Sequence, residues 1–341
     1  MNRKLLIISN ESISFENNKF SCDNIDMKSI PEALQESNFD VSLLARKAQD
    51  KRTKNINIKN IKISGNIFLY LFELFKNIKS INNTYLIISI SPYTFLAAMF
   101  LACFKKKPFV YLRSDGYKEY KSILGSYGSY IYHVMYVLVA KFSSLIACRE
   151  HLLKNRKGEI VNPSQLNDRW FNNQRVELKN LNNLLYIGRV RVEKGVFSLV
   201  KMLENSNLKL TIITSEKKSR ISKITNNISI KNFENKNDEI INCYDEHSIF
   251  ILPSYTEAHP QVLDEALARH KPVIIFEEIS HVIRNRKGVF MSKRNIKSLE
   301  ETVEYIIKDY NNIINEIKKN ILPTKKQFTE ELKNILTKKN D

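Results

Sequence analysis

Short apolar runs rich in β-branched residues alternate with longer amphipathic segments along most of this 341-residue chain. Such alternation is typical of parallel sheets whose strands are joined by crossover helices. In the first half the expected strands are Leu5–Ser9, Val41–Ala45, Ile56–Ile63, Tyr85–Ser91, Phe109–Arg113 and Ser144–Cys148. In the second half they are Leu184–Gly188, Lys209–Thr214, Ile228–Ile230, Ser248–Leu252 and Pro272–Phe276. The pattern predicts an α/β protein with two doubly wound domains.

A polar stretch without periodicity interrupts this alternation at Asn172–Asn180. It contains few apolar residues, which is typical of a linker between domains. We therefore expect an amino-terminal domain over residues 1–172, a linker over 173–182 and a carboxyl-terminal domain over 183–319. Residues 320–341 are expected to form a basic helix that could pack back on the first domain. Two domains also suit the length, since one domain commonly takes about 150 residues.

Cysteine spacing and the length of the apolar runs limit the cellular setting. The four cysteines lie far apart and form no Cys-x-x-Cys pair, so neither a zinc cage nor a redox motif is expected. A reducing, cytoplasmic compartment is the simplest interpretation. The apolar run Leu5–Ile8 is too short for a secretion signal and is expected to be a buried strand. The stretches Tyr93–Phe104 and Tyr130–Ala140 are both shorter than the roughly 20 residues of a membrane-spanning helix.

The chain carries a net charge of +18, from 54 lysines and arginines against 36 acidic residues. Such a balance favours polyanionic partners, namely nucleic acid, anionic lipid or phosphorylated small molecules. A general enrichment in Lys, Asn and Ile would also explain the charge, because it places lysine on every solvated face. The sequence has neither an RNA-binding signature with interleaved aromatic residues nor a recognition-helix pattern. We therefore expect no nucleic-acid partner.

The segment Leu184–Gly195 combines a buried strand, a basic turn and the start of a helix. Gly188 ends the strand, and its missing side chain would let a ligand approach the backbone closely. Arg189 and Lys194 bracket the beginning of the helix, where free N–H groups already favour anions. This environment suits a diphosphate. The alternative is that two basic residues flank a turn by chance in a lysine-rich chain.

A second segment, Ile249–Leu267, places two carboxylates eight residues apart. Glu257 stands on the loop after a strand, and Pro260 opens a helix that carries Glu265. Two carboxylates in this arrangement could contact two hydroxyl-bearing parts of one extended ligand. The N–H groups of Gln261–Leu263 would then meet its phosphates. Taken singly, each carboxylate could instead be an ordinary solvated residue.

Together these segments resemble the GT-B glycosyltransferases of family 4, which are also called group 1. That family begins its second domain with a strand followed by Gly-Arg, four residues and Lys-Gly, as in Gly188–Gly195 here. It also carries a Glu-x7-Glu motif after a strand that ends in Leu-Pro-Ser. In this chain Leu252–Ser254 is that strand end, and Glu257 and Glu265 are the motif. The Lys-Pro-Val strand of the family is matched by Lys271–Val273.

The resemblance covers about Leu184–Phe276 and implies a GT-B fold, with two Rossmann-like doubly wound domains facing a central cleft. It also implies that Arg189 and Lys194 hold the donor diphosphate, that Glu257 binds the sugar hydroxyls and that Glu265 binds the ribose. The nucleobase would pack near Phe233 and Glu234. The donor-binding residues implied in this way are Gly188, Arg189, Lys194, Phe233, Glu234, Glu257, His259, Pro260, Gln261, Val262, Leu263 and Glu265.

The chain departs from the family pattern at four places, one of which is Glu257–His259, where the family often shows Glu-Gly-Phe. Many members have a glycine pair after the first strand, where Ser9–Ser12 stands here. Members often place a histidine in a first-domain loop, where this chain has Ser114 and Asp115. The glycine pair after the Lys-Pro-Val strand is replaced by Glu277–His281. We take Asp115 as the first-domain member of a catalytic set whose other members are Arg189, Lys194 and Glu257.

The resemblance implies a retaining hexosyltransferase that moves a sugar from a UDP- or GDP-linked donor to a glycan or lipid-linked acceptor. Synthesis of a bacterial surface polysaccharide or lipopolysaccharide is the usual setting. No cofactor and no metal are expected, since fixed cations stabilise the leaving diphosphate and no Asp-x-Asp motif is present. Two other classes stay open: a GT-B-like enzyme of other sugar-nucleotide chemistry, and a basic membrane- or nucleic-acid-binding protein without catalysis.

A basic amphipathic segment in the first half suggests contact with an anionic membrane surface. Its apolar residues are Phe68, Leu69, Leu71, Phe72, Leu74 and Phe75, and its lysines are Lys76 and Lys79. Phe104 is followed by three further lysines, Lys105–Lys107. Surfaces of this kind suit anionic bilayers, and the protein would then lie at the inner face of the cytoplasmic membrane. The alternative is a core helix that ends in a lysine-rich turn.

Overall fold

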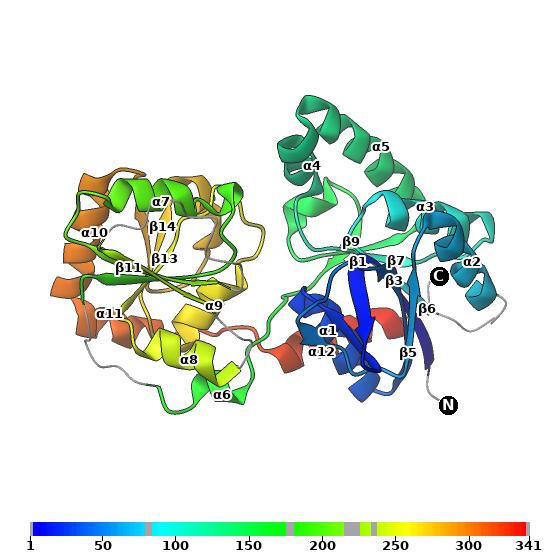
Figure 1. Cartoon of the computed structure of the whole chain (residues 1–341), viewed down its shortest axis with the longest axis horizontal. Coiled ribbons are helices and arrows are strands. Elements are labelled where there is room, and N and C mark those ends of the chain that lie inside the picture. The colour runs from blue at the N-terminus through cyan, green and yellow to red at the C-terminus, as the bar shows by residue number, and fades with distance from the viewer. Residues whose placement is uncertain (1–2, 79–83, 175–180, 215–225, 233–236, 339–341) are drawn as a thin grey trace. The chain divides into compact units, whose positions relative to one another are not determined.

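The computed structural model describes residues 3–78, 84–174, 181–214, 226–232 and 237–338 (Figure 1). The chain divides into two compact units. Unit 1 comprises residues 1–163 and 326–341, and unit 2 comprises residues 164–325. Each unit is an α/β sandwich, so the predicted fold class is confirmed.

Unit 1 is built on a parallel sheet with the strand order β5-β3-β1-β6-β7-β8-β9. Its strands are β1 (Arg3–Glu16), β3 (Phe39–Lys47), β5 (Asn60–Ser64), β6 (Thr84–Ile88), β7 (Phe109–Leu112), β8 (Ser144–Ala147) and β9 (Gly158–Ile160). Strand β1 continues past a bulge after Ile8 and pairs there, antiparallel, with β2 (Lys19–Cys22), which in turn pairs with β4 (Lys54–Asn55). The segment Ser9–Ser12, where the family often has a glycine loop, is therefore part of a long bent strand.

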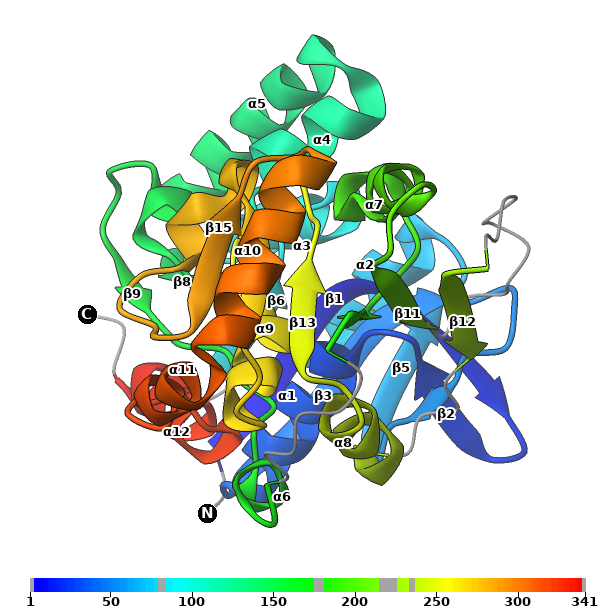
Figure 2. The same cartoon turned by 90° about the vertical axis from the view of Figure 1, so that its left-hand side faces the viewer.

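Helices cover both faces of this sheet. They are α1 (Ile25–Glu36), α2 (Ile67–Ile78), α3 (Pro92–Cys103), α4 (Gly116–Leu124), α5 (Ser126–Phe142) and α12 (Lys325–Thr337). Figures 1 and 2 show α1 and α12 on one face and α2, α3 and α5 on the other. The last helix is tied to this unit by contacts far apart in sequence. The Phe328 ring lies 6.2 Å from the Tyr111 ring, and the Glu331 carboxylate accepts the N–H of Asn162 at 2.7 Å.

Unit 2 has an entirely parallel sheet with the order β12-β11-β10-β13-β14-β15. Its strands are β10 (Asn183–Ile187), β11 (Lys209–Thr214), β12 (Ile228–Asn232), β13 (Ile249–Leu252), β14 (Val273–Phe276) and β15 (Val289–Ser292). Its helices are α6 (Asp168–Phe171), α7 (Val196–Leu203), α8 (Asn237–Asp245), α9 (Gln261–Ala268), α10 (Ile296–Lys308) and α11 (Tyr310–Ile317). Figures 1 and 2 both place α7 and α8 on opposite faces of the sheet. Four β-branched or aromatic side chains of β14 are buried together, as expected for a strand covered on both faces.

The boundary between the units lies nearer the amino terminus than the sequence suggests. We expected the first domain to extend to residue 172, but the chain enters unit 2 at Ser164. The reason is a buried arginine after α9. Arg269 forms two hydrogen bonds to the Asp245 carboxylate and donates to the backbone carbonyl oxygens of Trp170, Asn172 and Asn173. These contacts bind the segment around α6 to unit 2. Part of the expected linker, residues 175–180, lies outside the described residues.

Within the described parts of the chain, no helix is both long enough and apolar enough to span a bilayer.

Candidate functional site

The main candidate site lies at the carboxyl end of the unit 2 sheet. Strand β10 has β11 on one side and β13 on the other, so the connections diverge between β10 and β13. Open α/β sheets bind ligands at the carboxyl edge of their strands, at such a point of divergence. The loops that follow β10 and β13 are the two segments that carry the predicted motifs. Parallel pairing brings these loops together although they are about 60 residues apart in sequence.

The turn after β10 is shaped by Gly188. A β-carbon at this position would lie 2.6 Å from the Tyr186 hydroxyl oxygen, too close for any residue other than glycine without a shift of that ring. The same hydroxyl donates a 2.8 Å hydrogen bond to the carbonyl oxygen of Arg189. The Arg189 side chain is exposed, and its guanidinium makes no hydrogen bond to the described residues. A cation is thus held at the rim of the turn and is accessible to a soluble anion.

Gly195 joins the two loops. It adopts a left-handed conformation with φ = 67° at the start of α7, and a β-carbon there would lie 1.8 Å from the carbonyl oxygen of Pro253. Only glycine suits both constraints. A second contact joins the same two loops: the N–H of Tyr255 donates to the carbonyl oxygen of Glu193 at 3.0 Å. The close backbone packing fixes Lys194 against the loop after β13.

Lys194 and Glu257 meet at this junction. The Lys194 ammonium lies 2.5 Å from Oε1 of Glu257, and the Ser254 hydroxyl donates to the same oxygen at 2.7 Å. The carbonyl oxygen of Glu257 lies 2.8 Å from Nε2 of His281, which follows β14. Both charged side chains are only partly buried, with 22% and 10% exposed. The ion pair can therefore be reached by a ligand, which could offer an anionic group to Lys194 and hydroxyl groups to Glu257.

Arg294 supports the loop that carries Glu257. Its guanidinium donates to the carbonyl oxygen of Pro253 at 3.0 Å and lies over the Tyr255 ring, 4.1 Å from the ring centroid. On its other side it contacts the Phe276 ring and donates to Glu278 at 2.6 Å. A planar cation that stacks on two rings and binds two acceptors holds a loop more firmly than an ammonium could. Arg294 therefore positions the loop, and with it Glu257.

Glu265 lies on α9 in a much less polar environment. Burial raises the pKa of its carboxyl group to about 7, against the effect of a 3.0 Å hydrogen bond from the Tyr244 hydroxyl. The Tyr244 hydroxyl also lies 3.2 Å from the carbonyl oxygen of Val262. Tyr244 packs against Trp170 and Phe250 in the core. Its ring thus determines where the Glu265 carboxyl group points.

The start of α9 only partly resembles the expected phosphate cradle. Pro260 occupies the position before the helix, and the N–H of Leu263 already donates to its carbonyl oxygen at 3.1 Å. The side chain of Leu263 is buried in the core, while Gln261 and Val262 are partly exposed. Of the three N–H groups that we expected to meet phosphates, that of Leu263 is therefore already used within the protein.

His259 belongs to a cluster with Asp264 and Arg286 at α9. Its Nε2 lies 3.4 Å from the Asp264 carboxylate, which accepts two hydrogen bonds from Arg286 at 2.7 Å and 2.9 Å. The His259 side chain is 3% exposed. Its surroundings give it a structural role in holding the α9 start. The two residues expected at the nucleobase, Phe233 and Glu234, lie outside the described residues.

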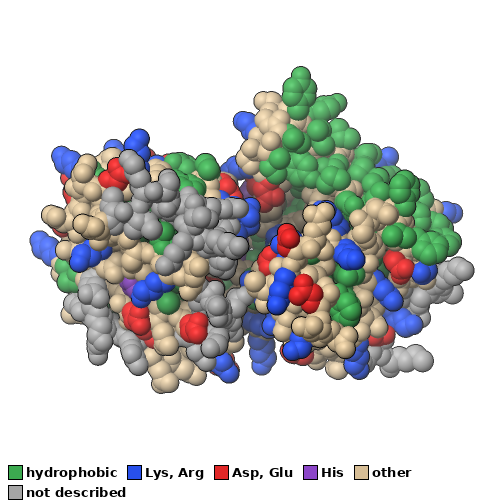
Figure 3. All heavy atoms as spheres, in the orientation of Figure 1, with side chains coloured by type: hydrophobic (Ala, Val, Ile, Leu, Met, Phe, Trp, Pro, Cys, Tyr) green, Lys and Arg blue, Asp and Glu red, His purple; other side chains and the backbone are tan. Residues whose placement is uncertain are grey.

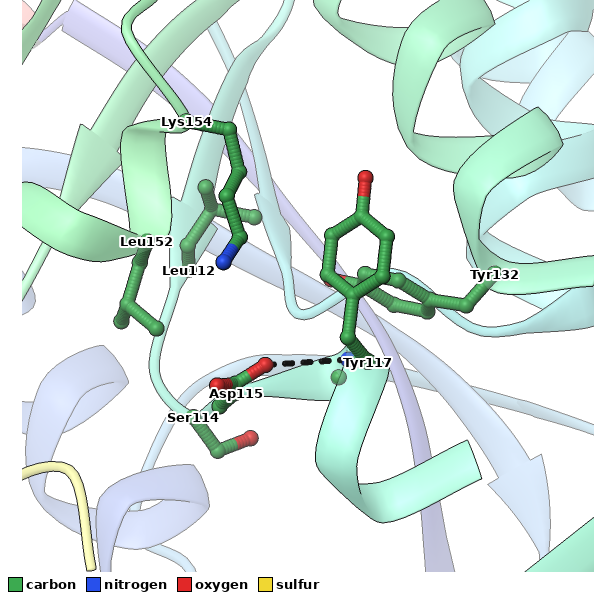
Figure 4. A pocket seen from close by; sticks show the side chains of 8 residues that line it. Leu112, Ser114, Asp115, Tyr117, Tyr132, Leu152 and Lys154 are labelled. Atoms are coloured by element: carbon green, nitrogen blue, oxygen red, sulfur yellow. Dashed lines mark hydrogen bonds between the residues drawn. The ribbon is translucent and has the colours of Figure 1, made fainter. Parts of the chain in front are cut away.

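Asp115 lies in unit 1 and caps a helix. Its Oδ1 accepts the N–H groups of Tyr117 and Lys118 at 3.1 Å and 3.3 Å, which satisfies two free donors at the start of α4. Together with Tyr132 and Lys154 it lines a small pocket (Figure 4). Asp115 follows the carboxyl end of β7 by three residues. The cap already uses one of its two carboxylate oxygens.

Several residues of the site were not predicted from the sequence. Arg294, Tyr244 and Tyr186 act on the motif residues from other elements, and His281 contacts the backbone of Glu257. Arg294 and His281 shared one signal, since each is a basic residue soon after a parallel strand of the same sheet. Tyr244 gave no such signal, because an aromatic residue in an amphipathic helix is usually part of the core.

Residues 168–321 match the family model of the glycosyl transferases group 1. A search of curated protein sequences finds no match to this chain. Solved structures with the same fold include sucrose-phosphate synthase from Thermosynechococcus elongatus, at 13% identity and a TM-score of 0.69, with 98% of each chain covered.

Two further solved structures have the same overall architecture. Anabaena Alr3699/HepE in complex with UDP and glucose has 11% identity and a TM-score of 0.69, with 99% of this chain and 100% of that chain covered. WaaG, a glycosyltransferase involved in lipopolysaccharide biosynthesis, has 13% identity and a TM-score of 0.64, with 98% of this chain and 99% of that chain covered. At these identities the structural likeness establishes the fold alone, and the family match is confined to residues 168–321.

Proposed function

We propose that this chain, of which residues 168–321 match the group 1 glycosyltransferases and which has the GT-B fold, is a retaining hexosyltransferase with a UDP- or GDP-linked donor. The observation that carries the proposal is the meeting of Lys194, Glu257 and Gly195 at the carboxyl edge of the unit 2 sheet. The donor is placed there with its diphosphate beside Arg189 and Lys194.

The proposed chemistry needs charge stabilisation more than it needs a base. When the bond between the sugar and the diphosphate breaks, negative charge grows on the departing phosphate. Arg189 and Lys194 stabilise that charge, and Gln261 and Val262 lie beside it at the start of α9, where the helix dipole favours anions. These fixed cations make the reaction independent of a metal ion, so activity should persist in EDTA.

The remaining donor residues have distinct proposed roles. Glu257 accepts hydrogen bonds from the sugar hydroxyls, and Gly188 lets the diphosphate approach the backbone. Glu265, held by Tyr244, accepts hydrogen bonds from the ribose. Phe233 and Glu234 contact the nucleobase. The remaining donor-side residues are His259, Pro260 and Leu263, which lie at or next to the start of α9.

The acceptor is proposed to bind unit 1, with Asp115 near the reacting carbon. A glycan or lipid-linked acceptor in bacterial surface polysaccharide or lipopolysaccharide synthesis fits the likeness to WaaG. The protein would then work at the inner face of the cytoplasmic membrane. Support for this location comes from α2, on which Phe68 and Phe72 are exposed and the Lys76 ammonium lies 4.5 Å from the Phe72 ring centroid.

The deciding experiment measures turnover across nucleotide sugars for the parent protein and for Lys194→Ala. Loss of one such charge-stabilising group raises the barrier by about 2.7–4 kcal/mol, so kcat should fall by roughly 10²–10³-fold. Lys201→Ala is the matched control, since Lys201 is an exposed lysine on the following helix. Parent activity in Lys194→Ala would contradict the diphosphate assignment, and full activity in Glu257→Ala would contradict the sugar assignment.

A further inference from the structure

Helix α5 is apolar on two faces, of which only one is buried. Toward the unit 1 core it buries residues such as Tyr132, Met135 and Tyr136. The opposite face carries exposed residues at helical spacing, namely Tyr127, Tyr130, Ile131, Val134, Leu138 and Phe142. Tyr127 is 83% exposed and Tyr130 is 69% exposed. A helix in a water-soluble protein normally has charged residues on this face.

The apolar surface continues over the neighbouring helices. Ile123 and Leu124 extend it along α4, Leu96 along α3, and Phe68 and Phe72 along α2. Helix α5 contacts α3 and α4, and α3 contacts α2. Figure 3 shows the resulting hydrophobic surface as one continuous region of unit 1. We call it the apolar face. Patches of this extent on a monomer commonly mark an interaction site.

The charges around the apolar face are nearly all positive. Residues 67–149, which include all of α2, contain ten lysines and arginines but only three acidic residues, Glu73, Asp115 and Glu119. Lys121 and Lys141 flank the exposed stripe of α5 at its two ends, and both are exposed. A second copy of the same face would bring lysine against lysine, which disfavours a symmetric dimer. An anionic lipid surface complements both properties, since it accepts apolar side chains and attracts lysines.

We propose that the apolar face lies on an anionic bilayer, with the exposed stripe of α5 entering the headgroup region. Tyrosine rings suit that depth because they have an apolar body and a polar tip. The proposal extends the membrane contact proposed above from α2 to α5. Only the biological role of this membrane contact rests on the proposed function. The lipid binding itself needs neither a sugar donor nor turnover. The membrane would bring a lipid-linked acceptor to unit 1.

The test is cosedimentation of the full chain with vesicles of phosphatidylcholine, with and without phosphatidylglycerol. The parent should bind the anionic vesicles, and binding should fall as salt rises. The triple variant Tyr127→Ser, Tyr130→Ser, Ile131→Ser should bind at least tenfold more weakly. Each lysine near an anionic surface contributes about fivefold in affinity, so Lys121→Glu with Lys141→Glu should also lose about tenfold or more. Tyr305→Ser with Ile321→Ser, which changes exposed apolar residues of unit 2, should bind like the parent.

Three results would overturn the proposal: no binding of the parent to anionic vesicles at low salt, undiminished binding by the triple variant, or a parent dimer in sedimentation velocity that the triple variant abolishes. Nucleoside diphosphate binding by titration calorimetry on the same proteins separates this proposal from the proposed function. It should be unchanged in the triple variant. A parent that binds lipid but no nucleotide would contradict the proposed function alone.

Discussion

Units 1 and 2 have the same architecture but place their charged and apolar side chains differently. Unit 2 gathers ion pairs at the carboxyl edge of its sheet, where Lys194 meets Glu257 and Arg294 meets Glu278. Its outer helices are conventionally amphipathic, as α10 shows with Leu299, Val303 and Ile306 buried. Unit 1 instead leaves an apolar stripe on α5 in water. The fold itself requires neither feature.

The difference teaches which parts of each unit serve folding and which serve binding. Both sheets are buried on two faces, so stability comes from the same kind of core in each. The paired charges of unit 2 suit a small charged ligand, and the uncovered face of unit 1 suits an extended surface. The predictions below test this division, beginning with the largest expected effect.

Replacement of Arg269 by alanine should destabilise unit 2 more than any other change considered. Arg269 is 1% exposed and pairs with Asp245, so its removal leaves a buried carboxylate and three carbonyl oxygens without their donor. The expected loss is about 3–5 kcal/mol in the free energy of unfolding. Trp170 is the only tryptophan and lies in unit 2, so its fluorescence during urea unfolding reports this unit. Arg52→Ala in unit 1 removes an exposed pair with Asp23 and should cost less than about 1 kcal/mol.

Gly195→Ala should damage the candidate site directly. Its positive φ and the contact with the Pro253 carbonyl oxygen leave no room for a methyl group. We expect a loss of about 1–3 kcal/mol in unfolding free energy and weaker nucleotide binding. Gly65→Ala is the matched control, because a β-carbon at Gly65 meets no atom within 4 Å. If the two variants behaved alike in urea unfolding and calorimetry, the contact between the two loops would be needed neither for stability nor for nucleotide binding.

Glu265 should make the stability of unit 2 depend on pH. Its folded pKa of about 7 lies above the ordinary value of 4.5, so the folded state holds a proton that the unfolded state has lost. This stabilisation is complete below pH 4.5 and is lost as pH rises through about 7. Relative to Glu265→Gln, the parent should lose up to about 1.4 kcal/mol per pH unit in that window. Urea unfolding from pH 5 to 8, followed by Trp170 fluorescence, measures the difference. Parallel pH profiles of the two proteins would disprove it.

Tyr127→Ser should leave the stability of the protein in solution almost unchanged. Its side chain is 83% exposed, so folding gains little from it, and a change below about 0.5 kcal/mol is expected. Urea unfolding followed by circular dichroism provides the measurement. A clear loss of unfolding free energy would mean that the apolar face of unit 1 is packed in solution. The proposed difference between units 1 and 2 would then be wrong.

Most of the fold could be predicted from hydrophobic pattern alone. The strands that the sequence missed, β2, β4, β9 and β15, are short or lie at sheet edges, where few apolar residues mark them. Apolar residues at helical spacing run from Ile296 to Ile317, but Asp309 leaves the helical conformation and divides this segment into α10 and α11. Pattern could not locate the unit boundary either, since Arg269 acts on residues almost 100 positions away.

The residues of the candidate site that belong to a sequence motif could be predicted. The resemblance to the group 1 glycosyltransferases implied that Lys194 and Glu257 bind parts of one donor, and the structure brings these two side chains together. The supporting residues were not predictable, because Arg294 and Tyr244 reach the motif across the sheet from other elements. Side chains that act through tertiary contacts leave no local pattern in the sequence.

The return of α12 to unit 1 has a consequence for how the protein is made. Unit 2 is one continuous stretch of chain, and its ends are joined where the N–H of Lys325 donates to the carbonyl oxygen of Leu166 at 2.7 Å. Unit 1 needs Phe328, Leu332 and Leu336, which are synthesised after the whole of unit 2. Unit 2 can therefore fold before α12 is synthesised, while unit 1 waits for α12 to complete the cover of one sheet face. A stop codon shortly before Phe328 would leave unit 2 able to fold but would prevent unit 1 from folding, although most of unit 1 is encoded first.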